Sequence, residues 1–151
     1  MLVRDILNLK GGTIYRIDAS EPLTLAVQLL VQHDVGSLVV MEGGRMAGML
    51  TFREVLRALE RSGGLADVLA REVMVKDPVC GKLGDTIDEL REAMTRHHVR
   101  YLPVKDADTL LGVVSFHDVA KAVIKETSME NRLLKRYIEH APEAGSKSDC
   151  Q

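Results

Sequence analysis

The amino-acid sequence contains one pattern twice, and this internal repeat restricts the fold more than any other feature. The octet GMLTFREV at residues 48–55 returns as GVVSFHDV at 112–119, an offset of 64 residues. The same offset aligns Val40 with Val104, and apolar positions stay aligned without a gap over roughly forty residues. A chain of this kind folds as two similar halves that pack against each other, because about sixty residues alone bury little surface.

Each copy has the same predicted order of elements. Apolar residues with helical spacing come first, then two short β-branched stretches joined by a turn, and then a second helical pattern. In the first copy these segments are 22–35, 37–41, 46–50 and 51–63. In the second copy they are 86–99, 100–104, 110–114 and 115–126. Short strands that alternate with helices predict an α/β unit in each half.

Composition excludes several classes of protein. The 151 residues are 46% hydrophobic, enough for one compact core, and 20 basic residues nearly balance 22 acidic ones. This balance gives no reason to expect general nucleic-acid binding. The apolar runs are too short to span a bilayer, and charges at residues 4 and 5 interrupt any signal peptide. Cys80 and Cys150 form no metal or redox motif. We therefore expect a soluble cytoplasmic protein without a membrane partner.

Residues 127–151 follow the second copy. An apolar stripe of Leu133, Leu134, Tyr137 and Ile138 predicts an additional helix, and the polar segment 142–151 predicts a frayed end. The stripe has two interpretations of similar weight. Either it closes the core of its own domain, or it forms a dimer contact.

The repeated octet also has two interpretations. Thr51 and Glu54 fit a capping box at a helix start, and Ser115 and Asp118 fit it less well because Asp is a poorer third-position residue than Glu. Alternatively, the free amides of a helix start attract an anion. A hydroxyl beside a phosphate, a carboxylate that accepts from ribose hydroxyls, and a basic or imidazole group at residue 53 or 117 together indicate a nucleotide site.

At this point the sequence resembles the CBS domain (cystathionine-β-synthase type), and the tandem pair resembles a Bateman module. The resemblance rests on LPV at 102–104, on G-x-x-[ST]-x-x-[DE] in both copies, and on VRDIL at 3–7 and REVM at 71–74. It implies an α/β (α+β) fold: two β-α-β-β-α motifs, residues 1–63 and 64–126, packed pseudo-symmetrically into one module, plus the C-terminal helix. ENRLLKRYI at 130–138 resembles the closing segment of small stand-alone bacterial CBS-pair proteins.

The resemblance also implies ligands and their contacts. Family members often bind AMP, ADP, ATP, S-adenosylmethionine or NAD in the two clefts between the copies, and commonly form disc-like homodimers. By position, Asp118 would hold the ribose, with Ser115 and His117 near phosphate and Arg100 directed toward it. Segments that usually line the adenine pocket carry Val79 in the second copy and Ile14 and Tyr15 in the first. The remaining candidate positions are Thr51, Arg53, Glu54 and His98.

The first copy departs from the family pattern at two places. Glu54 stands where the family prefers Asp, and Gly36 and Ser37 replace the Arg-Tyr pair that opens the strand of the second copy. We therefore expect the site built on Ser115 and Asp118 to bind better than the site built on Thr51 and Glu54.

Other chemistry has little support. His97 and His98 lack a metal-ligand spacing, so they are either a solvated helix end or, for His98, part of an electropositive phosphate cleft with Arg100. No nucleophile elbow, P-loop or dinucleotide fingerprint is present. The sequence thus predicts a homodimeric regulatory module, not an enzyme, that binds an adenine nucleotide and signals its occupancy to an unidentified partner. The alternative is a structural dimerisation module without a ligand.

Overall fold

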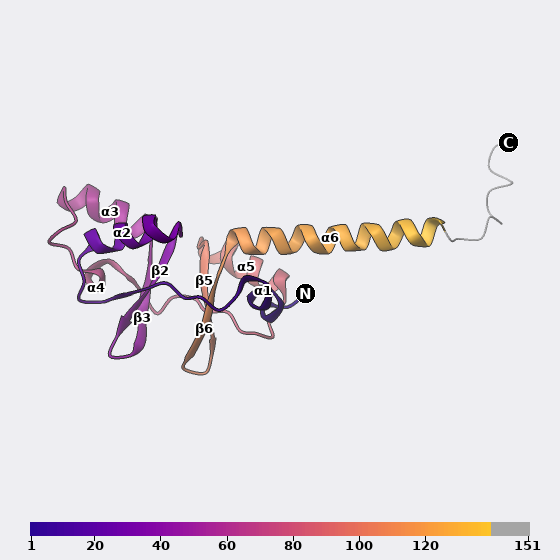
Figure 1. Ribbon diagram of the computed structural model, residues 1–151, viewed down its shortest axis with the longest axis horizontal. Helices are drawn as coiled ribbons and strands as arrows, with labels where there is room; N and C mark the ends of the chain where they lie inside the picture. Colours follow the sequence, from indigo (N-terminus) through magenta and orange to yellow (C-terminus); the bar gives the residue numbers. More distant parts are fainter. Residues whose placement is uncertain (140–151) are drawn as a thin grey trace.

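Figure 1 shows a computed structural model of the chain, in which residues 1–139 are described. The predicted frayed end and Cys150 lie outside the described residues. Two small sheets stand side by side, and helices pack against each. The first sheet has the order β1-β2-β3-β4, with bounds Arg16–Asp18, Ser37–Glu42, Arg45–Thr51 and Val75–Lys76. The second consists of β5 (Tyr101–Asp106) and β6 (Thr109–Ser115). The helices are α1 (Val3–Lys10), α2 (Leu23–His33), α3 (Phe52–Ser62), α4 (Ala70–Val73), α5 (Ile87–His97) and α6 (Phe116–Glu139). The predicted α/β fold with a C-terminal helix is confirmed.

The structure reproduces the repeat residue by residue. Helices α2 and α5 begin and end at positions 64 apart, and each ends on a left-handed residue, Asp34 or His98. The hairpins share their register, since Ser37 pairs with Thr51 as Tyr101 pairs with Ser115. Both hairpins carry an irregularity at the same place, after residue 40 in one and after residue 104 in the other. The octets therefore occupy equivalent positions, each joining a strand end to a helix start.

The first strand differs between the copies. In the first copy β1 runs parallel to β2 over three residues. In the second copy the equivalent strand is reduced to one parallel bridge between Gly81 and Val104. The strand β4 lies in the chain before this bridge and pairs with β3 of the first copy. The sheet of the first copy thus extends into the segment that leads to the second copy.

The lead-in helices are exchanged between the two halves. Helix α1 precedes the first copy, but its buried Val3 and Ile6 belong to the hydrophobic core of the second copy. Helix α4 leads into the second copy, yet Ala70 belongs to the core of the first. Each half therefore depends on a helix from the other side of the repeat. The chain must cross between the halves at residues 11–15, and this crossing places those residues beside the second copy.

Helix α6 is one continuous 24-residue helix that begins in the second octet. The predicted division between a second-copy helix and a separate C-terminal helix at residue 127 does not correspond to any break. In Figure 1 the helix projects well past the sheets. Its stripe is exposed: 61% of Leu133, 59% of Leu134, 77% of Tyr137 and 70% of Ile138. The interpretation that the stripe closes the core of its own domain is therefore wrong for the chain as described.

Candidate functional site

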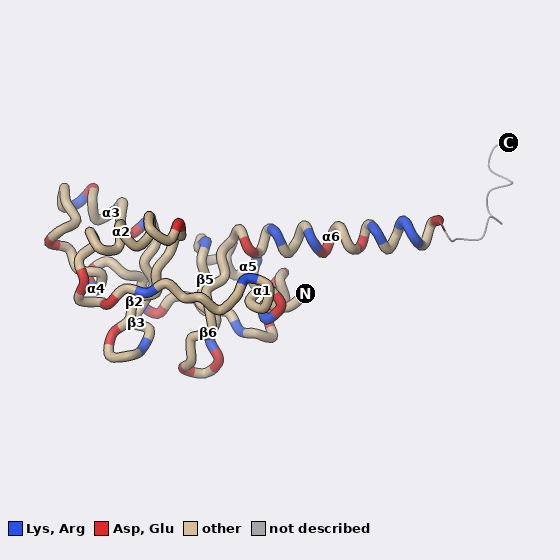
Figure 2. Tube along the Cα trace, viewed as in Figure 1, with Lys and Arg blue, Asp and Glu red and all other residues tan. Residues whose placement is uncertain are grey.

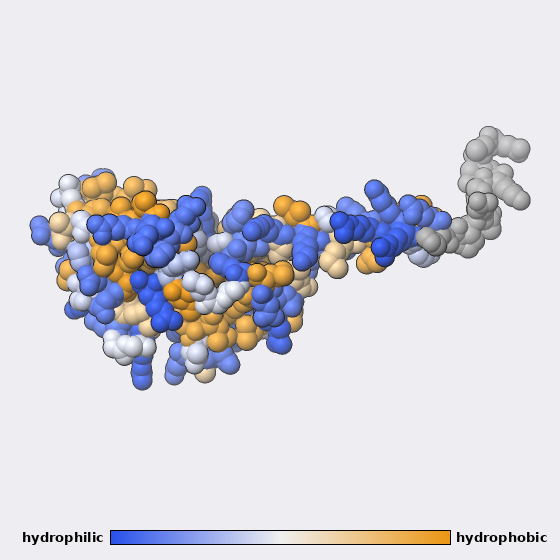
Figure 3. Space-filling model, in the orientation of Figure 1, coloured by the Kyte–Doolittle hydropathy of each residue, from blue (hydrophilic) through white to orange (hydrophobic). Residues whose placement is uncertain are grey.

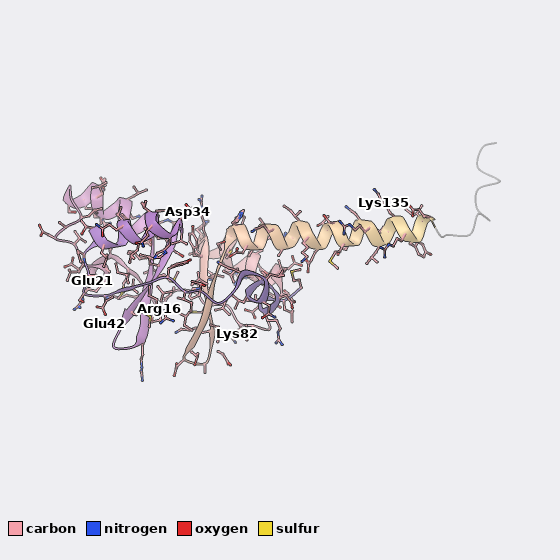
Figure 4. All side chains as sticks on the ribbon, in the orientation of Figure 1. Arg16, Glu21, Asp34, Glu42, Lys82 and Lys135 are labelled. Atoms are coloured by element: carbon pink, nitrogen blue, oxygen red, sulfur yellow. The ribbon has the colours of Figure 1, made fainter. Side chains whose placement is uncertain are left out.

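Two cavities lie between the copies. The larger, called cleft 1, has a volume of about 1060 Å³, and the smaller, called cleft 2, about 570 Å³. Both have the size of small-molecule sites in proteins, which usually measure about 300–1,000 Å³. Figure 4 shows one border of cleft 1, where Asp34 at the end of α2 faces the second half of the molecule.

Cleft 1 combines the octet of the second copy with the crossing segment of the first. The octet contributes Ser115 and His117 from the end of β6 and the start of α6. The first copy contributes Ile14 and Tyr15, because the exchange of α1 carries the chain across at this point. The other predicted site residues that line cleft 1 are Arg53, His98 and Arg100. The structure therefore brings together seven predicted positions from both copies around one cavity.

Cleft 2 has the reciprocal construction. It is lined by Thr51, Arg53 and Glu54 of the first octet and by Val79 from the segment that leads into the second copy. Each segment that was predicted to line an adenine pocket thus lines the same cleft as the octet of the opposite copy. His97 lines cleft 2 whereas His98 lines cleft 1, as expected for adjacent residues that point in different directions.

Four residues, Arg53, Val99, Arg100 and Tyr101, line both clefts. Arg53 comes from the first turn of α3, and its Nη2 donates to the His98 carbonyl, 3.1 Å away in the other copy. Two arginines therefore stand where the clefts meet. Anionic groups bound in either cleft would encounter positive charge there, and a phosphate pairs well with the planar arginine fork.

The second octet forms a complete capping box. The Ser115 amide donates to Asp118 Oδ2 over 2.9 Å, and the Asp118 amide donates to Ser115 Oγ over 3.1 Å. The Lys10 ammonium also donates to Asp118 Oδ2, at 2.7 Å. Burial raises the pKa of the Asp118 carboxyl, but the hydrogen bonds from Lys10 and the Ser115 amide outweigh burial, so this pKa lies below its usual value. Asp118 itself does not line cleft 1, whereas Lys10 does.

The first octet is organised differently, and the expectation that it caps better is wrong. Thr51 Oγ1 accepts weakly from the Arg53 amide, at 3.3 Å, and donates to Glu54 Oε2 at 2.5 Å. The Glu54 side chain is one methylene longer than that of Asp118, and its carboxylate turns onto the hydroxyl instead of the Thr51 amide. Glu54 is 8% exposed and is the only charged residue classed as buried among residues 1–139. A carboxylate held in this way is less available to a ligand.

Sequence reasoning missed Lys10, Asp34 and Tyr101, all of which line cleft 1. Lys10 stands beside the glycines of KGGT, which the sequence suggests only as turn residues, and its role depends on the exchange of α1. Tyr15 has a neighbour that was also not predicted: its ring lies 4.5 Å from that of His33, at a tilt of 32°. This contact supports the Tyr15 ring at the wall of the cleft.

Among residues 1–139, no group of three or more His, Cys, Asp or Glu side chains is placed to hold a metal ion. None of the helices in this same range combines the length and the apolar character needed to cross a bilayer.

Comparison with known proteins identifies both halves. The family model of the CBS domain matches residues 3–61 and 70–125. The CBS domain-containing protein YhcV of Bacillus subtilis is 29% identical over 118 residues, which cover 78% of this chain and 82% of that protein. A CBS-domain protein from Agrobacterium tumefaciens, known by crystal structure, is 29% identical with a TM-score of 0.78, over 81% of this chain and 98% of that one.

A more distant structural relative is the CBS domain pair of protein MJ0100, solved in complex with 5-methylthioadenosine and S-adenosyl-L-methionine. It is 19% identical, has a TM-score of 0.72, and covers 82% of this chain and 99% of that chain. At this identity the likeness shows the fold alone. Two matched family segments, the exchanged lead-in helices and the pair of clefts lead to one conclusion: the chain belongs to the CBS-domain family and contains a tandem CBS pair.

Proposed function

We propose that this chain is a regulatory module that binds an adenine nucleotide, AMP, ADP, ATP or NAD, and communicates its occupancy to a partner protein. The CBS pair is a regulatory unit, and the module has no catalytic activity of its own. The partner is a protein whose activity depends on nucleotide levels, and the cytoplasm is the compartment that such a sensor would serve.

The observation that carries this proposal is the composition of cleft 1. It is bordered by the start of α6, where the positive end of the helix dipole favours an anion. Arg53 and Arg100 add positive charge, and Ile14 with Tyr15 supplies an apolar wall for a base. A phosphate site next to an aromatic and aliphatic wall fits a nucleotide better than it fits a free anion or a purely apolar ligand.

Cleft 1 is the stronger of the two candidate sites. In cleft 2 the carboxylate of Glu54 is buried against the Thr51 hydroxyl. The MJ0100 complex supports the ligand class, because that CBS pair accepts two adenosine compounds. A ligand regulates such a module only if it binds two conformations with different affinity. The junction between two halves is a suitable place for such a difference.

Calorimetric titration of the full chain with AMP, ATP and NAD tests the proposal. We expect heat of binding and a rise in melting temperature with at least one of them, because a ligand that binds only the folded state stabilises it. Absence of both effects with all three ligands would overturn the nucleotide-sensor function. Mass spectrometry of ligand released from the purified protein by denaturation identifies the nucleotide directly.

A second candidate function, homodimerisation through α6, is supported by the direction of its apolar stripe. Val119 and Ala122 are buried on the body of the second copy, and Met129, Leu133 and Tyr137 follow them at spacings of seven, four and four residues, which place them on the same side of the helix. The apolar side that packs on the body therefore continues along the projecting helix for about 20 Å. Figure 3 shows hydrophobic side chains on this projecting part.

The occupant that fits this face is a second copy of the chain. Basic and acidic residues are interspersed along α6, as Figure 2 shows, so an antiparallel pair could match opposite charges beside the apolar stripe. Light scattering after gel filtration should give a dimer for the parent chain and for Asn131→Asp, a control on the polar side of the helix. The double variant Leu133→Asp/Tyr137→Asp should be monomeric. A monomeric parent chain at micromolar concentration would contradict this function.

A further inference from the structure

Lys10 connects the crossing segment to the candidate ribose carboxylate. It is the last residue of α1, and Gly11 ends the helix with a φ of 91°. The Lys10 ammonium donates to two acceptors of the second copy, Asp118 Oδ2 at 2.7 Å and the Val113 carbonyl at 2.8 Å. The side chain of Asp118 is 14% exposed and that of Lys10 is 37% exposed. The ammonium thus covers the carboxylate from the solvent side.

This arrangement limits what Asp118 can offer to a ligand. Oδ2 already accepts from the Ser115 amide and from Lys10, while no hydrogen bond to Oδ1 is found among the described residues. Cleft 1 is lined by Lys10 and not by Asp118. A ribose that approaches from the cleft therefore meets the ammonium before it meets the carboxylate. Two ribose hydroxyls that each bond a separate oxygen of this carboxylate must therefore compete with Lys10 for Oδ2.

We propose that Lys10 is a specificity-determining residue that competes with the ligand's ribose hydroxyls for Asp118. The inference rests on the proposed nucleotide-binding function. A ligand with both hydroxyls regains hydrogen bonds to Asp118 when it displaces the ammonium, and the partly exposed ammonium moves into water. A ligand without these hydroxyls has nothing to exchange with Asp118, so it leaves the ion pair intact.

The competition predicts the direction in which the preference for a ribose ligand changes when Lys10 is removed. In the parent chain the gain from the ribose diol is offset by loss of the Lys10 ion pair, which reduces the preference for ribose. When Lys10 is removed, the diol bonds Asp118 without this offset. The preference for AMP over 2′,3′-dideoxy-AMP should therefore increase, by about fivefold for a partly exposed pair.

The experiment is a titration of AMP and 2′,3′-dideoxy-AMP into the parent chain and into Lys10→Met. Lys121→Met is the matched control, because Lys121 is an exposed lysine of α6 that lines neither cleft. Lys10→Gln also removes the cation and takes its place if Lys10→Met folds poorly, whereas Lys10→Arg retains the cation and shows whether an effect comes from loss of the charge. We expect an increased AMP preference for Lys10→Met only, with Lys10→Arg and Lys121→Met close to the parent chain.

Two outcomes overturn the inference while leaving the nucleotide function standing. If Lys10→Met keeps the parental affinity for both ligands, Lys10 only anchors α1. If Lys10→Met weakens both ligands equally, Lys10 binds phosphate instead of competing for ribose. Should no variant, nor the parent chain, bind AMP, ATP or NAD, both the inference and the proposed function are wrong.

Discussion

Gly36 lies directly against the phenol of Tyr101 in the other copy. Tyr101 follows Arg100, the residue at the position equivalent to Gly36. A Cβ on Gly36 would overlap the Tyr101 hydroxyl and stand 2.7 Å from Cζ, far inside van der Waals contact. Gly36 occupies the position that Arg100 holds in the second copy. The first copy thus lacks a side chain here because Tyr101 fills the space, and this contact lies at cleft 1, which Gly36 and Tyr101 both line.

Gly36→Ala should destabilise the fold by about 1–3 kcal/mol, because an added methyl in a filled site forces its neighbours to move. Tyr101→Phe removes the hydroxyl, so the alanine should cost less in that background. Denaturant unfolding of the four variants of this cycle measures the difference. Gly84→Ala is the control, since nothing lies within 4 Å of a Cβ there. Equal costs for Gly36→Ala in both backgrounds would refute the Tyr101 contact.

The two octets should respond differently to loss of their hydroxyl groups. Ser115→Ala removes one cap and should cost about 1 kcal/mol. Thr51→Ala removes a weak cap and also the hydroxyl that hydrogen-bonds the buried Glu54. An unsatisfied buried group costs about 1–3 kcal/mol, more when it is charged. Thermal and denaturant unfolding should therefore show the larger loss for Thr51→Ala, and the opposite order would contradict the hydrogen bonding described for the first octet.

Stability should depend on pH through the ion pair of Lys10 and Asp118. Because the folded pKa of Asp118 is lowered, the stability from this pair is present above the unfolded pKa of about 3.9 and is lost as pH falls through the folded value. The difference in melting temperature between the parent chain and Lys10→Met should be constant near neutrality and shrink below about pH 4. A difference that persists unchanged to pH 2 would show that the pair does not provide it.

Much of this structure could be predicted from sequence because the repeat is gapless. The offset of 64 predicts equivalent helices and hairpins, and the hairpin registers follow it to the residue. Local sequence patterns do not predict which half of the molecule a helix packs against. The exchange of α1 and α4 depends on contacts between distant segments, so the pairing of Ile14 with the second octet could not be derived from either copy alone.

In the octets, side-chain length decides which group the carboxylate bonds, and residue type alone does not predict this. Glu is the usual partner in a capping box, yet Glu54 bonds the Thr51 hydroxyl while the shorter Asp118 bonds the Ser115 amide. The contact of Lys10 with Asp118 could not be predicted from the sequence for a different reason. Residues 10 and 118 are remote in sequence, and only the crossing of the chain brings the ammonium to the carboxylate.

Binding of AMP to Asp118→Ala and Glu54→Ala, measured by calorimetry against the parent chain, tests the central claim that the second octet holds the nucleotide. Lost hydrogen bonds to a charged group correspond to about 1.5–3 kcal/mol, so Asp118→Ala should weaken binding by about ten- to a hundredfold. Asp118→Asn, which preserves shape and an oxygen for the cap, separates loss of charge from loss of fold. Glu54→Ala should retain most of the affinity. Unchanged affinity in Asp118→Ala together with abolished binding in Glu54→Ala would contradict the account and assign the site to the first octet.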